Sequence, residues 1–584
     1  MKPVHWSAIP LAATLCIITT PATPATAVPT TTRTTVARTT AAGTTATGTT
    51  VAGTTIAGTT VAGTTVAGTT VAGTTAAGTT AAGTTAAGTT VAGTTAAGTT
   101  AAGTTAAGTT AAGTAVAGRI AWHFCALGPG DAAGAALDRA GVECGDVAVP
   151  LDHSRPRGRS ISVAIARSRG ADTAHRIGSM VINLGGPASP VLDAVPLARA
   201  AMGETGERFD LIGMDPRFAG RSSPIDCGWP ARWLPRSAGA DRAGFDAMVA
   251  LTRDLAARCG RTEAALLPYA STANIARDMD VVRAALGEPR LSYLGYSQGS
   301  LLGAAYAQLF PDRADRIVLD SAIDPALPGT LALRDTAAGR EAGLRDWAAW
   351  AAARDAEYHL GANADAVLGV VRGVYAAAAR RPLRVGTYSV DDTLVPGLIV
   401  TPLTDDSGDD ELARVVAALA RAAEGRPAEP TEEMARTLEG LVGGVGSAQH
   451  SAQTAVLCGD AEVSRDPRVY WRDIRAHRAA SPLFEPLART ITPCAAWPNT
   501  PKEPAVRIGN AVPALIVQAE KDVNSQLPGA RALHRALTGS RMIVLDGART
   551  HGVYLFRGAA CVDRAVDAYL ASGVLPAADR SCSE

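Results

Sequence analysis

The pentapeptide at 295–299 reads Gly-Tyr-Ser-Gln-Gly and has the residue types of a serine nucleophile. A short apolar run, 291–294, precedes it, and a run rich in small residues, 300–307, follows it. A strand that turns sharply into a helix leaves no room for side chains beside the serine, which explains the two flanking glycines. We therefore predict that Ser297 lies at a strand-to-helix turn and is a catalytic nucleophile; a purely structural turn is the alternative.

A serine hydroxyl becomes a good nucleophile only when a base takes its proton and an acid orients that base. In a mainly parallel sheet both partners are expected after the serine, on loops at the carboxyl ends of late strands. Asp522 follows the apolar run 514–517, and His551 follows the run 542–545. We predict that Ser297, Asp522 and His551 form a catalytic triad.

Other carboxylates and histidines fit this order less well. Asp320 and Asp324 follow an earlier strand, where some hydrolases have their acid, so this pair stays open as an alternative to Asp522. Glu520 comes two residues earlier than Asp522 and is expected still within the strand. Four other histidines fit the order poorly, because they lie in a helical run or precede the serine: His534, His123, His153 and His175.

The reaction also needs donors for the oxyanion that develops on the substrate carbonyl. The backbone N–H of Gln298, directly after the serine, is one candidate. The loop that begins at Asn183 contains Gly185 and Gly186 before Pro187, and two glycines let a backbone approach the substrate closely. We predict the N–H of Gly186 as the second donor.

Around these residues the chain from about 120 alternates apolar strand-like runs with helical runs. This alternation predicts an α/β-hydrolase fold, with a mainly parallel sheet, helices on both faces and an inserted helical cap. We expect the core in two parts, 119–325 and 505–584, the second of which carries the acid and the histidine. The cap is expected at 326–504, which is rich in Ala and Arg and mostly helical in pattern.

The first 118 residues have a different character. Residues 1–27 read as a secretory signal peptide, with Lys2 before a short apolar stretch and small residues at the expected cleavage site. Residues 28–118 are dominated by a five-residue repeat of Ala, Gly, Thr and Val that lacks aromatic residues. Such a composition predicts a disordered tether. A β-solenoid is the structured alternative, but it would need a large inward-facing residue in each repeat.

Composition narrows the partners and the compartment. Lys plus Arg and Asp plus Glu both number 54, and no basic run occurs, so nucleic acid is not expected as a partner. No apolar run reaches the length of a transmembrane helix. The sequence predicts no metal and no cofactor, since no cysteine lies at metal-ligand spacing from a histidine pair. Behind a signal peptide, an even number of cysteines indicates disulfides and an extracellular location; the eight are Cys125, Cys144, Cys227, Cys259, Cys458, Cys494, Cys561 and Cys582.

Several motifs together resemble the secreted tripeptidyl aminopeptidase branch of the α/β-hydrolases, which is related to the prolyl iminopeptidases. They are the serine motif 295–303, Leu-Phe-Pro-Asp-Arg at 309–313, Val-Leu-Asp-Ser-Ala-Ile-Asp-Pro at 318–325, the loop 183–187 and the final cysteine pair. The resemblance implies release of short peptides from free N-termini. It also implies that cysteines pair with their sequence neighbours: Cys125–Cys144, Cys227–Cys259, Cys458–Cys494 and Cys561–Cys582.

An aminopeptidase must also neutralise the substrate's ammonium group, and Asp460 in the expected cap is the candidate, with a helix-terminus or surface role as the alternative. The acidic run 405–411 could bind a cation or this ammonium; a solvated helix N-terminus is the competing interpretation. Ala188 and Gln298 depart from the family pattern, so an esterase or lipase-like enzyme with the same triad remains an alternative. A second one is a non-catalytic, wall-associated binding protein that reaches the cell wall through its tether.

Overall fold

The computed structural model describes residues 120–583 and the backbone of seven short strands between residues 40 and 102. The predicted signal peptide lies outside the described residues. Contacts divide the chain into two compact units, one of which is residues 14–114 and the other of which contains residues 115–584. No helix in the described part is long and apolar enough to cross a membrane.

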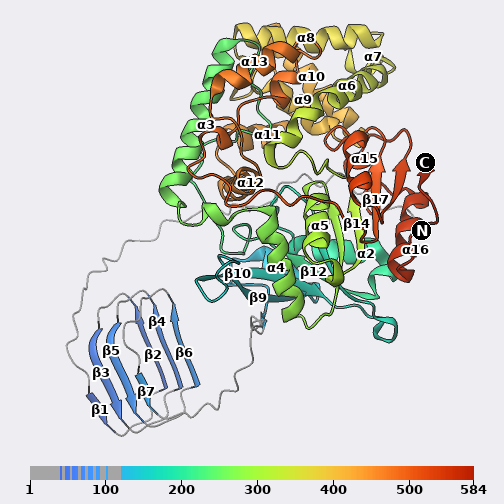
Figure 1. The fold of residues 1–584 in the computed structure, drawn as a ribbon. Coiled ribbons are helices and arrows are strands. Elements are labelled where there is room, and N and C mark those ends of the chain that lie inside the picture. Colours follow the sequence, from blue (N-terminus) through green and yellow to red (C-terminus); the bar gives the residue numbers. More distant parts are fainter. Residues whose placement is uncertain are drawn as a thin grey trace. The chain divides into compact units, whose positions relative to one another are not determined.

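A ten-stranded sheet forms the centre of the larger unit (Figure 1). Its strands in chain order are β8 (Ala121–His123), β9 (Glu143–Pro150), β10 (Ser160–Ser168), β11 (Gly178–Asn183), β12 (Phe209–Met214), β13 (Leu291–Tyr296), β14 (Ala314–Asp320), β17 (Ala514–Ala519), β18 (Arg541–Leu545) and β19 (Arg580–Cys582). They lie side by side in the order β19-β18-β17-β14-β13-β11-β12-β10-β9-β8. Every pair from β12 to β19 is parallel, and the pairs that involve β8, β9 and β10 are antiparallel. The predicted fold class is confirmed.

Helices cover both faces of this sheet, which explains why its central strands are apolar on both sides. The helices of the core are α1 (Ala132–Arg139), α2 (Val195–Gly206), α3 (Arg242–Thr262), α4 (Thr272–Ala285), α5 (Gln298–Leu309), α15 (Leu527–Ala536) and α16 (Ala560–Ser572). Successive residues of β13 point to opposite faces of the sheet. Tyr293 packs in one hydrophobic cluster with α4 and α5, and Leu294 packs in another with α2 and α16.

A helical insertion separates β14 from β17, as the sequence predicts, and Figure 1 shows it apart from the sheet, in the upper part of the view. Its helices are α6 (Thr336–Ala352), α7 (Asp355–Tyr358), α8 (Ala364–Arg380), α9 (Val395–Leu403), α10 (Asp409–Ala423), α11 (Glu432–Val442), α12 (Ser447–Asp460), α13 (Pro467–His477) and α14 (Glu485–Ala488), with a hairpin of β15 (Leu383–Val385) and β16 (Tyr388–Val390). Most of these elements share a hydrophobic core of their own around Trp347. In contrast, α12 and α13 pack in the cluster that contains α3 and α4. The insertion is therefore a cap whose later helices join the sheet domain.

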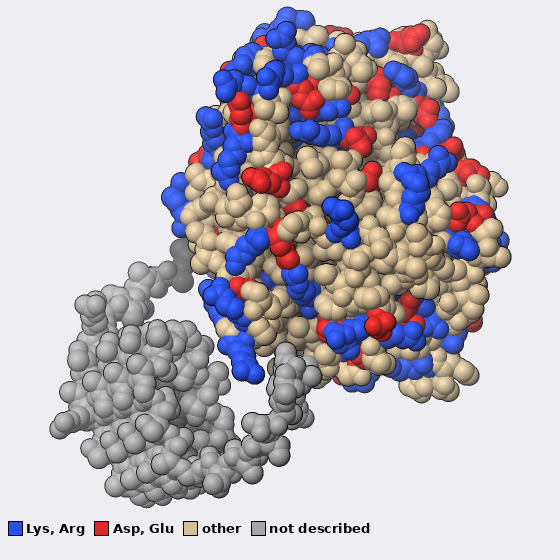
Figure 2. Space-filling view, viewed as in Figure 1, with Lys and Arg blue, Asp and Glu red and all other residues tan. Residues whose placement is uncertain are grey.

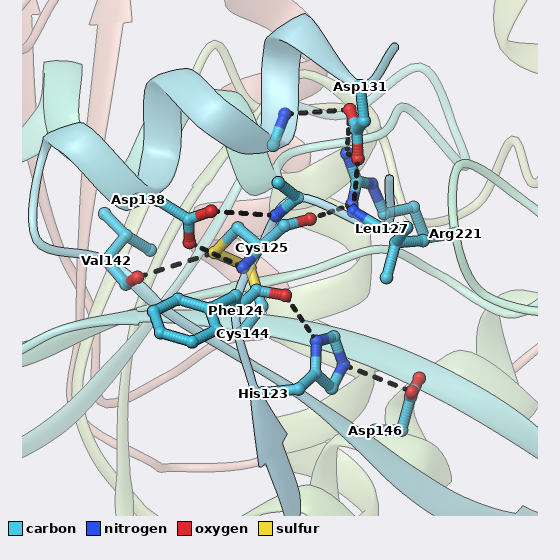
Figure 3. The surroundings of a disulfide bond; sticks show 12 residues. His123, Phe124, Cys125, Leu127, Asp131, Asp138, Val142, Cys144, Asp146 and Arg221 are labelled. Carbon is cyan, nitrogen blue, oxygen red and sulfur yellow. Dashed lines mark hydrogen bonds and ion pairs between the residues drawn. A yellow bond between two sulfur atoms is a disulfide. The ribbon is translucent and has the colours of Figure 1, made fainter. Parts of the chain in front are cut away.

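Disulfides join the eight cysteines in the four pairs that the family resemblance implies. Figure 3 shows the first, where the N–H of Cys125 donates to Asp138 at 2.6 Å and Arg221 forms an ion pair with Asp131. This network ties the start of the described chain to β9. Each bond spans between 19 and 36 residues of sequence, so all four are local staples rather than links between core and cap halves.

Seven short strands lie in the repeat region. They are β1 (Thr40–Ala42), β2 (Thr47–Ala52), β3 (Ile56–Ala62), β4 (Ala67–Ala72), β5 (Ala76–Ala82), β6 (Ala87–Ala92) and β7 (Thr100–Ala102). They form two parallel sheets, β1-β3-β5-β7 and β2-β4-β6, in which each residue pairs with the one 20 positions later, as Thr40 does with Thr60. The offset of 20 residues corresponds to four repeats and places like residues opposite each other, as in Thr49 and Thr69.

Figure 2 shows basic and acidic side chains interspersed over the visible face of the described surface, with no extended field of one sign. This distribution agrees with the equal numbers of basic and acidic residues in the chain. It offers no electrostatic track for a nucleic-acid backbone on that face.

Candidate active site

Ser297 lies at the turn between β13 and α5, as the pentapeptide predicts. Its backbone has φ 55° and ψ −125°, a conformation that costs energy for a residue other than glycine. A Cβ on Gly295 would lie 2.5 Å from the carbonyl oxygen of Gly299, and a Cβ on Gly299 would lie 2.7 Å from Oδ1 of Asn183. Both flanking glycines are therefore required by close packing.

The strained turn is tied to its surroundings through the backbone of Ser297. Its N–H donates to the carbonyl oxygen of Asp320 at 3.0 Å, and its own carbonyl accepts from the hydroxyl of Ser300 at 2.6 Å. The side-chain oxygen of Ser297 takes no part in these bonds. The turn is thus fixed while the hydroxyl stays available for chemistry.

Asp522 and His551 are in contact. Nδ1 of His551 lies 2.8 Å from Oδ2 of Asp522, which is 2% exposed in the loop between β17 and α15. The other carboxylate oxygen accepts from the backbone N–H groups of Asn524 at 2.8 Å and Ser525 at 3.0 Å. One oxygen therefore fixes the carboxylate, and the second orients the imidazole, as an acid in a triad must.

The environment of His551 stabilises its protonated form. Burial is the largest influence and opposes the charge, but the charge and hydrogen bond of Asp522, with the charge of Asp320, outweigh it and raise the pKa of His551. The nearby guanidinium of Arg340 acts in the opposite direction. Arg340 belongs to cap helix α6 and is itself buried, which lowers its pKa to about 10. A raised pKa suits a base that must hold a proton during the reaction.

Asp320, the rival acid, has a different position. It is 0% exposed, and its carboxylate accepts from the backbone N–H groups of Val553 at 3.0 Å and Tyr554 at 2.8 Å. Burial raises its pKa to about 7. The neighbouring Ser321 hydroxyl accepts from the N–H of Gly552 at 2.7 Å. Asp320 therefore holds the backbone of the histidine loop and does not bind the imidazole ring.

The other candidates have partners of their own. Asp324 accepts the N–H of Ala326, and Glu520, one residue after β17 rather than within it, accepts the N–H of Gly547. The four histidines weighed against His551 each contact a different aspartate: His123 with Asp146 (Figure 3), His153 with Asp278, His175 with Asp172 and His534 with Asp579. None of these pairs includes a residue of the predicted triad.

The predicted oxyanion loop lies against the serine turn. A Cβ on Gly185 would lie 3.0 Å from Cβ of Ser297 and 3.1 Å from the backbone nitrogen of Gln298, so only glycine fits there. Gly186 follows with φ 109°, and its carbonyl accepts from Nε2 of Gln453 at 2.5 Å. Sequence reasoning missed Gln453, since it belongs to cap helix α12 and lies 267 residues from its partner.

Asp460 ends α12, and its two oxygens accept from the backbone N–H and the hydroxyl of Thr272, at 2.7 Å and 2.6 Å, where α4 begins. It is 6% exposed, and burial raises its pKa to about 6. These contacts fit the helix-terminus alternative, since both carboxylate oxygens accept from Thr272; the substrate-ammonium role of Asp460 stays a prediction.

The fold and the arrangement of these side chains define a serine hydrolase of the α/β-hydrolase fold. Comparison with family models agrees: residues 179–402 match "alpha/beta hydrolase fold", and residues 481–582 match "TAP-like protein". The chain belongs to the tripeptidyl aminopeptidase family of α/β-hydrolases. It is 34% identical over 456 residues to the tripeptidyl aminopeptidase of Streptomyces coelicolor, an alignment that covers 76% of this chain and 83% of the relative.

Two mycobacterial relatives are more distant. Serine protease Hip1 of Mycobacterium tuberculosis is 29% identical over 485 residues, with 76% of this chain and 87% of the relative covered. Carboxylesterase B of the same organism is 29% identical over 477 residues, with 76% of this chain and 86% of the relative covered. The matched relatives thus carry both peptidase and esterase names.

Proposed function

We propose that this protein is an aminopeptidase that releases tripeptides from free N-termini through an acyl-enzyme on Ser297. The observation that carries the proposal is the His551–Asp522 pair at 2.8 Å in a fold whose serine has the strained backbone of a nucleophile. The names of the two Streptomyces relatives support tripeptides as the product.

In the first half-reaction, the Ser297 hydroxyl oxygen attacks the carbonyl carbon of the scissile bond, and its proton passes to Nε2 of His551. Nδ1 keeps its hydrogen toward Asp522, which fixes the tautomer in which Nε2 is free to accept. The negative charge moves to the carbonyl oxygen, where the N–H groups of Gln298 and Gly186 are the proposed donors. The C–N bond then breaks as His551 gives its proton to the leaving amine.

In the second half-reaction, a water molecule replaces the leaving peptide. His551 takes a proton from the water, and the resulting hydroxide attacks the ester carbon of the acyl-enzyme. Collapse of the second tetrahedral intermediate breaks the bond to Ser297 Oγ, which recovers its proton from His551. The products are the released N-terminal peptide with a new carboxylate and the shortened peptide with a new amine.

An ester substrate is the second candidate, and the relative named Carboxylesterase B favours it. The triad chemistry is the same for an ester, because only the leaving atom changes from nitrogen to oxygen. What separates the two classes is recognition of a free ammonium group, which an esterase does not need.

We also propose that residues 1–27 direct secretion and that the repeat in 28–118 spaces the enzyme from the cell wall. Four disulfides suit an oxidising compartment. The domain boundaries at 118, 325 and 504 follow the sequence, and peptides with free N-termini are the expected partners. A non-catalytic wall-binding role is less well supported, because a scaffold has no use for a buried carboxylate that orients a histidine.

A panel of chromogenic substrates tests the function. Purified protein is assayed with free tripeptidyl, N-blocked tripeptidyl, single aminoacyl and short-chain ester substrates. We expect the free tripeptidyl substrate to have the highest kcat/KM and blocking to reduce it by at least a hundredfold. Equal turnover of blocked and free peptides, or faster turnover of the ester, would favour the esterase. His551→Ala should be inactive on every substrate, whereas His534→Ala, which removes a histidine paired with Asp579, should match wild type.

A further inference from the structure

The acidic run 405–411 places Asp409, Asp410 and Glu411 in the first turn of helix α10, as the helix-terminus interpretation predicts, but Asp409 is buried rather than solvated. Its first carboxylates face the loop that carries His551. The run joins cap helices α9 and α10, and Asp409 is the first residue of α10. Sequence neighbours Asp410 and Glu411 turn elsewhere, to Arg414 and Thr431.

The strongest contact in this region is a buried ion pair. Nη2 of Arg549 binds Oδ1 of Asp409, and the two residues are 4% and 5% exposed. The other terminal nitrogen of Arg549 donates to the carbonyl oxygen of Leu403 at 2.6 Å. A backbone bond runs beside them, from the N–H of Asp406 to the carbonyl oxygen of Arg549 at 2.9 Å. The residue two positions before His551 is thus fixed to the cap through side chain and backbone.

Two further contacts extend this attachment along the loop. The hydroxyl of Thr550, directly before His551, donates to Oδ2 of Asp405. Arg557, six residues after His551, forms an ion pair with Asp406. The cap therefore contacts the chain on both sides of the histidine.

The core holds the same loop from its other side. Asp320 and Ser321, at the end of β14, accept the backbone N–H groups of 552–554. The core bonds follow His551 in sequence, whereas the cap bonds of Arg549 and Thr550 precede it. The ring can keep its 2.8 Å contact with Asp522 only while the backbone at 551 stays in place.

We propose that Asp405 and Asp409 of the cap are positioning residues for His551, so that the catalytic base is competent only when this part of the cap is seated on the histidine loop. The inference rests on the proposed role of His551 as the base. It gives the cap a task beyond covering the site, because a displacement of about 1 Å in a catalytic group is enough to cost about a hundredfold in rate.

A purely structural role is the competing explanation, since breaking one side of a buried ion pair also destabilises a fold. The two explanations differ in what they predict for folded protein. A structural role lowers the unfolding temperature and leaves kcat per folded molecule unchanged. A positioning role lowers kcat at temperatures where the variant is fully folded, and it leaves KM nearly unchanged because no substrate contact is removed.

Asp409→Asn and Thr550→Val provide the test, with matched controls beside each. Asp410→Asn removes the neighbouring carboxylate, which faces Arg414, and Thr550→Ser retains the hydroxyl that donates to Asp405. We expect kcat to fall at least tenfold in both test variants, with KM within about threefold of wild type, and both controls to keep wild-type kcat. The double variant Thr550→Val with Asp405→Ala should lose no more activity than the worse single variant, because the two changes remove the same hydrogen bond.

The pH profile supplies a readout that stability does not affect. The charged groups facing His551 are Asp522, Asp320 and Arg340, of which the two carboxylates raise its pKa. A loosened loop weakens the contact with Asp522, so the acidic limb of kcat/KM should move to lower pH in Asp409→Asn. Wild-type kcat and an unmoved acidic limb in both Asp409→Asn and Thr550→Val would overturn the inference. If His551→Ala itself retained activity, the proposed function would fail first, which distinguishes the two failures.

Discussion

Asp320 should make the stability of this protein fall as the pH rises from 3.8 to about 7. In the folded protein, burial raises the pKa of this carboxyl from 3.8 to about 7. A carboxyl whose pKa is higher in the folded state binds its proton more tightly there than in the unfolded chain. Its contribution to stability is therefore largest below pH 3.8 and is lost as the pH rises to about 7.

The size of the effect follows from the shift. Each pKa unit corresponds to about 1.4 kcal/mol, so a shift of about three units corresponds to about 4 kcal/mol between pH 4 and pH 8. Hydrogen bonds from Val553, Tyr554 and Ser321 stabilise the ionised carboxylate and so limit the rise of its pKa. An asparagine at this position cannot ionise, and its oxygen can still accept the two N–H groups that reach Oδ2. Asp320→Asn should thus remove the pH dependence without removing the anchor.

Urea unfolding of wild type and Asp320→Asn at several pH values measures this directly. Buried Asp215, Asp460 and Asp563 also have raised pKa values, so the difference between the two proteins, rather than either curve, isolates Asp320. We expect the difference in the free energy of unfolding, variant minus wild type, to rise by up to about 4 kcal/mol from pH 4 to pH 8. Asp324→Asn, which alters a half-buried carboxylate that accepts only the N–H of Ala326, should show no such gain. Parallel curves for wild type and Asp320→Asn would refute the reasoning.

Three other perturbations test separate parts of the molecule. In a peptide hydrolysis assay, Ser297→Ala should lower kcat by a factor of about 10⁶, because it removes the nucleophile. Asp522→Asn should lower kcat by a factor of about 10⁴, because the base loses its orienting partner. More than a few per cent residual activity in Ser297→Ala would indicate another nucleophile. Replacing Cys227 and Cys259 together by alanine removes a disulfide that spans 32 residues. Chain entropy predicts a loss of about 3–4 kcal/mol in the free energy of unfolding. An unchanged free energy of unfolding would mean that the disulfide does not form in the protein. Deleting 28–118 should leave kcat/KM on a small peptide within twofold of wild type and shift protein from the cell-bound to the medium fraction; a tenfold loss of activity would show that this region supports the catalytic domain.

Much of the fold follows from local patterns in the sequence. The strands β11 (Gly178–Asn183), β12 (Phe209–Met214) and β17 (Ala514–Ala519) follow mainly apolar runs, and every residue in them is buried, as expected for strands covered on both faces. The edge strands were not predicted: β8 and β19 have three residues each and carry exposed positions, so they lack the periodicity that marks a strand. In the repeat region, strands pair at an offset of 20 residues, and neither composition nor the five-residue period specifies which copies of the repeat pair.

The triad prediction rests on residue types, order and distance from strand ends, which few positions satisfy together, and the structure brings Asp522 and His551 into contact. The supporting carboxylates could not be predicted in this way. Asp320, Asp409, Asp460 and Asp522 all have low exposure, and nothing in the residue type distinguishes them. Their tasks are set by partners that are far away in the sequence: two backbone N–H groups for Asp320, Arg549 for Asp409, the start of α4 for Asp460 and the imidazole of His551 for Asp522.

These four carboxylates share one physical condition, which explains why three of them act on the backbone or on another charge. A buried carboxylate is stable only when hydrogen bonds or a cation replace the water it has lost. Asp460 has one hydrogen bond on each carboxylate oxygen, and both come from Thr272 at the start of a helix rather than from a titratable side chain. Asp522 differs because two backbone N–H groups satisfy one oxygen and leave the other for a histidine that exchanges protons. The position of the second partner, and not burial or charge, therefore separates the catalytic carboxylate from its neighbours.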